Sequence, residues 1–232
     1  MVYVDRCDAG RRLTERLPAL SGSGVVVLAL PRGGVPVAYP VAATLRVPLD
    51  VVVVRKLTVP DQPWLVFGAV GEEGVRVIDE DMVADAVVSE PERLAVTREQ
   101  GELLRRSAAR YRRDHPCRAL DGATAVIVDD GLATGASAHA ACAVARARGA
   151  VRVVFAVPVG AYQPIRALAA VADAIVCLHT PQPFGSIRLW YMDFAEVTDL
   201  EVCALLDSAA ENQPVPRRSV PSGTGVVGAA GI

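Results

Sequence analysis

The stretch that decides the fold is VIVDDGLATGAS, residues 126–137. An apolar run typical of a buried strand precedes two adjacent carboxylates, Asp129 and Asp130. A turn of small residues then leads into a helix start, where backbone amides and the helix dipole favour an anion. Because open α/β sheets bind ligands at the carboxyl ends of their strands, the stretch predicts a phosphate-binding turn at such an edge.

Neighbouring carboxylates repel a phosphate, so we expect them to face another part of the same ligand, such as two sugar hydroxyls. A Walker P-loop needs a lysine that this turn lacks. A nucleophile elbow needs Gly-x-Ser-x-Gly, whereas Ser137 falls inside the helix. An acidic turn that merely caps a helix leaves the preceding buried strand unexplained. The pattern therefore favours a phosphorylated sugar.

Outside this stretch, apolar runs alternate with helical patterns. Strands are predicted over 25–30, 49–54, 125–128, 151–157 and 174–178, and helices over 8–20, 35–45, 89–113, 135–148, 163–171 and 199–206. A β-hairpin preceded by a mobile loop is expected between residues 55 and 78. The alternation predicts an α/β fold with a central, mainly parallel sheet flanked by helices.

The 232 residues, 52% of them hydrophobic, suffice for one sizeable core. We expect a single domain over residues 1–208, with a small C-terminal hood mainly over 179–208. Residues 209–232 are rich in Pro, Gly and Ser and are expected to form a disordered tail.

The composition argues against several partners. A net charge of −2 gives no basic field for nucleic acid. Five scattered cysteines suggest neither a disulfide framework nor a structural zinc. The N-terminus lacks a leader pattern, and no apolar stretch of membrane-spanning length is free of charge, Pro or Gly. We therefore expect a soluble cytoplasmic protein with no membrane partner.

The string VIVDDGLATGAS resembles the signature of the type I phosphoribosyltransferases. The segments LALPRGGVPVA, VVVVRKL and WYMDFAEVTDLEV are similar to a bacterial subgroup whose acceptor is generally unassigned, and the resemblance covers roughly residues 4–206. It implies that Asp129 and Asp130 hold the ribose hydroxyls of phosphoribosyl pyrophosphate (PRPP). It assigns the 5-phosphate to the turn Gly131, Leu132, Ala133, Thr134, Gly135, Ala136 and Ser137.

A second motif, Arg32-Gly33-Gly34, ends the first predicted strand and offers a guanidinium and open backbone amides to an anion. The resemblance makes it the pyrophosphate loop, the alternative being a plain tight turn. Arg55 and Lys56 resemble the family's basic pair, the alternative being surface cations. Residues 57–67 are expected to close over the site and exclude water.

The resemblance implies transfer of a 5-phosphoribosyl group from PRPP to an acceptor, such as a nitrogen heterocycle, with release of pyrophosphate. The residues implied to be catalytic are Arg32, Lys56, Asp129 and Asp130. Mg²⁺ is expected to arrive with PRPP, with Asp129 and Asp130 as the protein groups nearest to it, and a homodimer is implied. The alternatives are a PRPP- or nucleotide-sensing regulator and a hydrolase or phosphorylase with the same phosphate turn.

One position departs from the pattern of hypoxanthine-guanine enzymes, which carry an aspartate general acid/base where this chain has Ala133. A methyl group moves no proton, so a 6-oxopurine acceptor is disfavoured. Other groups able to handle a proton are Glu72, Glu73, His179 and Asp193. The hood offers a set of side chains that either stack on the acceptor or form a small satellite core: Pro181, Phe184, Trp190, Tyr191 and Phe194.

Overall fold

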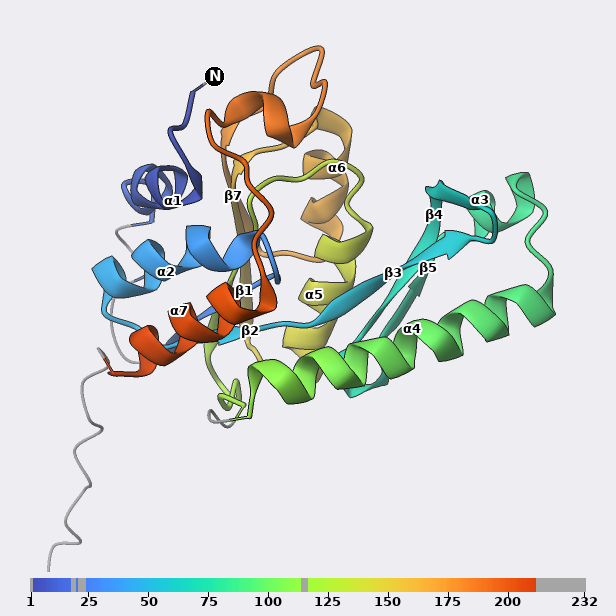
Figure 1. Ribbon diagram of the computed structural model, residues 1–232, viewed down its shortest axis with the longest axis horizontal. Helices are drawn as coiled ribbons and strands as arrows, with labels where there is room; N and C mark the ends of the chain where they lie inside the picture. The colour runs from blue at the N-terminus through green and yellow to red at the C-terminus, as the bar shows by residue number, and fades with distance from the viewer. Residues whose placement is uncertain (1, 18–19, 21–23, 114–116, 212–232) are drawn as a thin grey trace, which may run out of the picture.

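The computed structural model describes residues 2–17, 20, 24–113 and 117–211. Its centre is a five-stranded parallel sheet in the order β2-β1-β6-β7-β8. The strands are β1 (Val25–Ala29), β2 (Leu49–Val51), β6 (Thr124–Val128), β7 (Arg152–Val159) and β8 (Ala174–His179). The parallel α/β architecture predicted from the sequence is confirmed (Figure 1).

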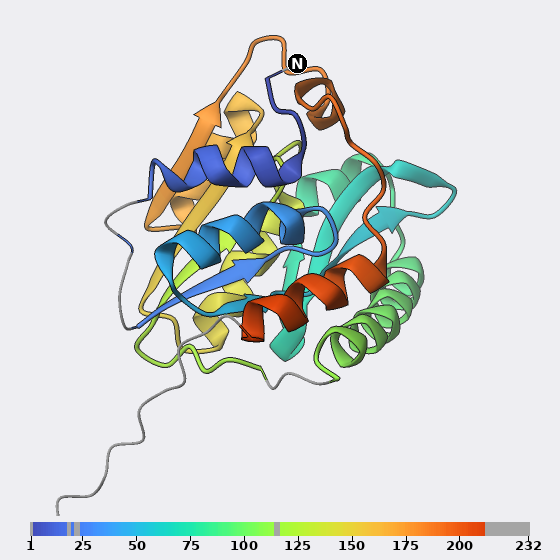
Figure 2. The same ribbon diagram turned by 60° about the vertical axis from the view of Figure 1, so that its left-hand side comes forward.

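The strands are continuously apolar because helices cover both faces of this sheet. In β6, Val126 and Val128 enter one core, whereas Ala125 and Ile127 enter the other. The first face is covered by α1 (Arg6–Thr14), α2 (Gly34–Leu45) and α7 (Asp199–Glu211). The opposite face is covered by α5 (Ala136–Ala147) and α6 (Tyr162–Ala167) (Figures 1 and 2).

The strand order reverses direction between β1 and β6, which lie side by side. From β1 the chain continues outward to β2, whereas from β6 it continues to β7 and β8. Such a switch point leaves a crevice outside the carboxyl ends of the two strands, where open α/β sheets bind ligands. The loop 31–34 follows β1 and the turn 129–135 follows β6, so both motifs meet at this crevice.

A second, antiparallel sheet of β3 (Val54–Val59), β4 (Gln62–Gly71) and β5 (Arg76–Ile78) projects from the first (Figure 1). It leads through the short helix α3 (Glu80–Asp85) to the long helix α4 (Glu90–Tyr111), which packs along it. The prediction of a mobile loop before the hairpin is therefore wrong, because Val54–Val59 and Gln62–Gly71 form paired strands joined by a turn at 60–61. The reason is burial, since Leu57 and Phe67 join a core with Leu104 of α4. The closure of residues 57–67 over the site stays a prediction.

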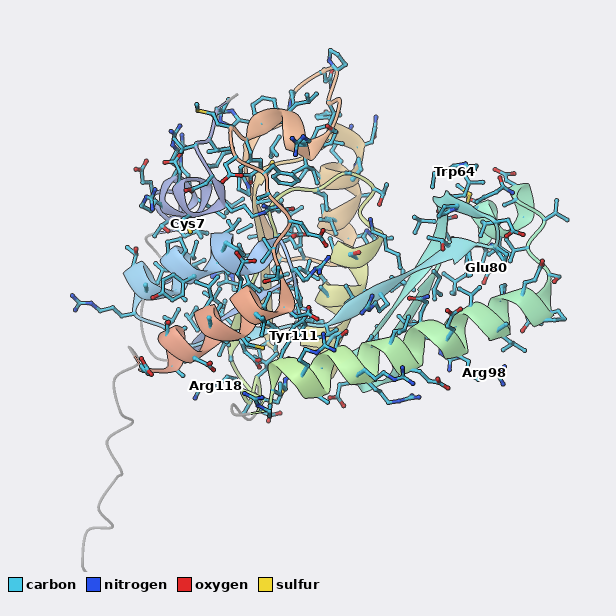
Figure 3. All side chains as sticks on the ribbon, in the orientation of Figure 1. Cys7, Trp64, Glu80, Arg98, Tyr111 and Arg118 are labelled. Atoms are coloured by element: carbon cyan, nitrogen blue, oxygen red, sulfur yellow. The ribbon has the colours of Figure 1, made fainter. Side chains whose placement is uncertain are left out.

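The tip of the β3–β4 hairpin lies far from the central sheet, and Trp64 there is 72% exposed (Figure 3). At the base of the second sheet, a buried ionic cluster joins it to the first. Arg148 donates to Asp50 of β2 at 3.0 Å, and Arg112 at the end of α4 pairs with both Asp50 and Glu72, the residue that follows β4. Removing one partner of such a buried pair usually costs about 3–5 kcal/mol, because the other charge is left buried and unpaired.

The C-terminal helix is longer than the sequence predicts. It runs to Glu211, so residues 209–211, which were assigned to a tail, belong to α7 instead. Tyr111 Oη donates to Asp199 at 2.6 Å and thereby joins the end of α4 to the start of α7. The remaining predicted tail, 212–232, lies outside the described residues. None of the helices within the described ranges has the length and hydropathy that a membrane span requires.

Candidate active site

The two motifs meet at the switch point in direct contact. An added Cβ on Gly33 would overlap the Asp130 carboxylate, and one on Gly34 would lie 2.6 Å from the Val128 carbonyl oxygen. Only glycine allows this approach, and Gly34 then begins α2. The Pro31–Arg32 peptide bond is cis. The loop after β1 is thus packed against the acidic pair after β6.

Asp130 of the acidic pair is buried, and Asp129 is half-buried. Asp130 is 9% exposed, and its backbone amide donates to Asp129 Oδ1 at 2.9 Å. Burial raises the pKa of the Asp129 carboxyl well above its usual range, and the neighbouring Asp130 raises it further. Burial also raises the pKa of Asp130, although the adjacent Arg6 guanidinium opposes that shift. Both carboxylates therefore carry a desolvation cost that a ligand with hydroxyl donors would offset.

Replacing Asp129 by Asn is expected to raise the free energy of unfolding at pH 7.5 by roughly 1–2 kcal/mol, the range typical of one stabilising change. The raised folded pKa means that the wild-type fold loses stability as pH rises above the ordinary aspartate range. The difference between the two proteins should therefore shrink toward acid pH. Urea denaturation across pH measures it, with the exposed Asp85→Asn as the control. A variant less stable than wild type at pH 7.5 would contradict the assigned cause.

The turn after the acidic pair divides into anchored and open residues. Gly131 lies against Ile187, and Leu132 donates to the Val159 carbonyl at 2.9 Å, which pins it to the end of β7. Ala133 and Thr134 are exposed. Gly135 then takes a left-handed φ of 92° and caps α5, where Ala136 and Ser137 begin the helix. The first amides of a helix lack intrahelical partners, so this turn presents free donors at the crevice.

Of the three basic residues predicted for the site, Arg32 and Lys56 lie near the acidic pair and Arg55 does not. Arg32 pairs with Glu196 at the mouth of the crevice. Lys56 of β3 lies close enough to Asp129 to lower the pKa of that carboxyl against the effect of burial. Arg55, the neighbouring residue on the same strand, donates to Ser107 of α4 at 2.8 Å instead. The structure thus brings Arg32 and Lys56 to the acidic pair and directs Arg55 toward α4.

A cleft of about 560 Å³ opens between these groups. It is lined by Arg6, Arg32, Gly33, Asp130 and Arg188, together with residues 194–197, called the strap below. The strap carries Glu196 to Arg32 and the Ala195 carbonyl to Arg6. The cleft is large enough for a sugar phosphate, and three of its lining residues are arginines.

Three of the hood aromatics belong to a small core. Tyr191 is buried against Tyr3, and its hydroxyl donates to the Asp130 carbonyl at 2.7 Å. Trp190 stacks on His179 with ring centroids 5.3 Å apart. Phe194 packs beside Tyr191 and also lines the cleft. The structure thus places these three rings in a satellite core, and stacking on the acceptor stays a prediction.

Of the four groups considered for proton handling, Glu72, His179 and Asp193 are engaged in structural contacts, whereas Glu73 is exposed. Glu72 accepts from the Val53 amide at 2.8 Å and pairs with Arg112, away from the crevice. Asp193 accepts from the Ala195 amide at 2.9 Å. The sequence did not point to Arg6 or Glu196, which the structure brings to the site, and it named Tyr191 only as a hood aromatic. The hydrogen-bond partners of Arg6 and Glu196 lie 124 to 189 residues away, and such pairs leave no periodic signal in a sequence.

The switch-point cleft, with its acidic pair and its row of open amides, is typical of α/β proteins that bind phosphorylated sugars. The family model of the phosphoribosyl transferase domain matches residues 6–187, and the chain belongs to this family.

Two Mycobacterium tuberculosis proteins, from strains H37Rv and CDC 1551 and each named "Putative phosphoribosyl transferase", are 53% identical over 208 residues, which is 90% of this chain. The chain spans about half the length of these relatives, 47%. The crystal structure of TT1426 from Thermus thermophilus is 43% identical and has a TM-score of 0.76. The match covers 89% of this chain and 98% of TT1426, so the fold extends over nearly all of that protein.

Proposed function

We propose that the protein transfers the 5-phosphoribosyl group of PRPP to a small acceptor and releases pyrophosphate. The observation that carries the proposal is the contact between Gly33, in the loop 31–34 that also carries Arg32, and the Asp130 carboxylate. PRPP joins a pyrophosphate to a ribose through one bond. A site for it needs anion-binding groups directly beside acceptors for sugar hydroxyls, and this contact provides that arrangement.

In this assignment, Asp129 and Asp130 accept hydrogen bonds from the ribose hydroxyls, and the amides after Ala133 bind the 5-phosphate. When the bond to pyrophosphate breaks, the leaving group gains negative charge and the ribose gains positive charge. Arg32 and Lys56 stabilise the former, and the acidic pair faces the latter. The acceptor nitrogen then forms a bond to C1 in place of the one to pyrophosphate, and its proton passes to the released pyrophosphate or to solvent.

The donor set fits a magnesium ion that comes with the substrate. Within the described residues no three His, Cys, Asp or Glu side chains gather into a metal cluster. Mg²⁺ is commonly held by one or two carboxylates together with substrate phosphates, and Asp129 and Asp130 provide such a pair. When bound with PRPP, the ion would neutralise charge on the pyrophosphate.

We propose a nitrogen heterocycle as the acceptor, other than a 6-oxopurine, because Ala133 offers no proton-transfer group. The homodimer and the cytoplasmic location stay predictions of the sequence.

The proposal is tested by incubating the protein with Mg²⁺, PRPP and a panel of nucleobases and related heterocycles while following pyrophosphate release. We expect release that depends on one class of acceptor. PRPP binding without release across the panel would favour the regulatory alternative. Release without any acceptor would indicate hydrolysis.

A further inference from the structure

Arg6, the first residue of α1, reaches the candidate site through three contacts. Its Nε donates to Asp130 Oδ2 at 2.8 Å, and an Nη donates to the Ala195 carbonyl at 2.8 Å. The guanidinium carbon also lies 3.8 Å from the centroid of the Phe194 ring. Each contact ends on the acidic pair or on the strap. The N-terminal helix therefore supplies part of the cleft wall.

The start of α1 holds this side chain in place. Asp5 precedes the helix in an extended conformation, and its carboxylate accepts from the Asp8 amide at 2.6 Å, which caps the first turn. Further along the helix, Gly10 lets α1 lie directly on α2. Arg6 is thus carried on a helix whose position is set by packing.

The pair between Arg6 and Asp130 is poorly explained by stability alone. The two side chains are only 11% and 13% exposed. Removing two charges from water costs about as much as their attraction returns, so a buried pair is a weak source of stability. What the pair does supply is a fixed orientation, because a carboxylate held on one oxygen by a guanidinium keeps one rotamer.

The held carboxylate retains capacity for a ligand. A carboxylate has about four lone-pair sites, and Arg6 occupies one of those on Oδ2. The same carboxylate already lies against Gly33, so Arg6 and Gly33 together confine it at the cleft. Without Arg6, the Asp130 carboxylate could rotate and lose its alignment with a sugar hydroxyl.

We propose that Arg6 is a positioning residue of the ribose subsite, which orients Asp130 toward a ribose hydroxyl and ties the strap to the same point. This inference rests on the proposed PRPP function. It assigns a role to the N-terminal helix, because Arg6 is the first residue of α1. Arg6 lies 124 residues before Asp130 in the chain.

The test compares three ligands by calorimetry: PRPP with Mg²⁺, ribose 5-phosphate and inorganic pyrophosphate. Arg6→Gln should weaken PRPP and ribose 5-phosphate binding together by roughly 10- to 100-fold, the usual cost of losing an outer partner of a ligating group. Pyrophosphate affinity should stay unchanged, because pyrophosphate has no ribose diol. Arg6→Lys keeps the charge and one donor nitrogen but loses the planar fork of the guanidinium, and it should recover part of the loss.

Arg11→Gln is the matched control, since it changes an exposed arginine on the same helix and should leave all three affinities unchanged. Equal weakening of all three ligands by Arg6→Gln and Arg6→Lys would show a general structural role and overturn the inference. Unchanged or tighter PRPP binding by the variants would also overturn it. Failure of the wild type to bind PRPP would overturn the proposed function and the inference with it.

Discussion

The double variant Asp129→Asn/Asp130→Asn is expected to lose at least about 100-fold in PRPP affinity. Each carboxylate would offer a charge-assisted hydrogen bond to a ribose hydroxyl, and such bonds contribute roughly 1.5–3 kcal/mol apiece. Two of them amount to about 3 kcal/mol or more, which is at least two orders of magnitude in the dissociation constant. Calorimetric titration with PRPP and Mg²⁺ measures the loss.

The fold of this variant should remain intact. An Asn side chain keeps one carbonyl oxygen, so position 129 can still accept from the backbone amide of residue 130, and position 130 can still accept from Arg6. Retained binding of inorganic pyrophosphate, together with a cooperative unfolding transition, would show that the fold persists and that only the sugar subsite is lost. Unchanged PRPP affinity would place the sugar elsewhere on the protein.

The central sheet could be predicted because its strands are buried on both faces. Such strands are short runs of β-branched and small apolar residues, and the predicted and observed bounds differ by at most two residues for β1, β6, β7 and β8. The second strand is shorter than predicted because the chain leaves the sheet after Val51 and enters the antiparallel sheet at Val54. The uninterrupted run of valines hides this change of direction.

The β3–β4 hairpin was missed for a different reason. Pro60, Asp61, Gln62 and Pro63 are typical of a loop, and two basic residues precede them. In the structure they mark a turn in which Asp61 takes a φ of 59°. The flanking strands are stabilised by burying Leu57 and Phe67 against α4, a helix that begins about 30 residues later in the chain. Tertiary packing of this kind outweighs local propensity.

The candidate site likewise has a part that local sequence predicts and a part that depends on tertiary contacts. The acidic pair, the turn and the glycine-rich loop are local motifs, and each follows a strand that could be recognised from its residues. Arg6, Tyr191 and Glu196 lie toward the two ends of the described residues and reach the motifs through hydrogen bonds between residues far apart in the sequence. Their roles depend on side-chain contacts, which composition and periodicity do not encode.

Two glycines within helices look equivalent in the sequence, yet opposite effects are expected when each is replaced by alanine. Gly10 of α1 lies against α2, and an added Cβ would overlap the Val37 carbonyl and lie 2.6 Å from Pro40 Cγ. Because a backbone oxygen cannot rotate away, the two helices must separate. We expect Gly10→Ala to lower the free energy of unfolding by about 2–3 kcal/mol, the upper part of the usual cost of overpacking.

Gly101 of α4 is the matched control, because an added Cβ there meets no atom within 4 Å. Alanine stabilises an open helical position by about 0.5–1 kcal/mol relative to glycine, so Gly101→Ala should raise the free energy of unfolding. Urea denaturation of the two variants measures both signs. PRPP titration adds a second comparison: moving α1 displaces Arg6, so Gly10→Ala should also weaken PRPP binding, whereas Gly101→Ala should not. A Gly10→Ala protein as stable as wild type would mean that α1 can shift on α2 without cost. The close packing of α1 on α2 would then not be what holds Arg6 in position.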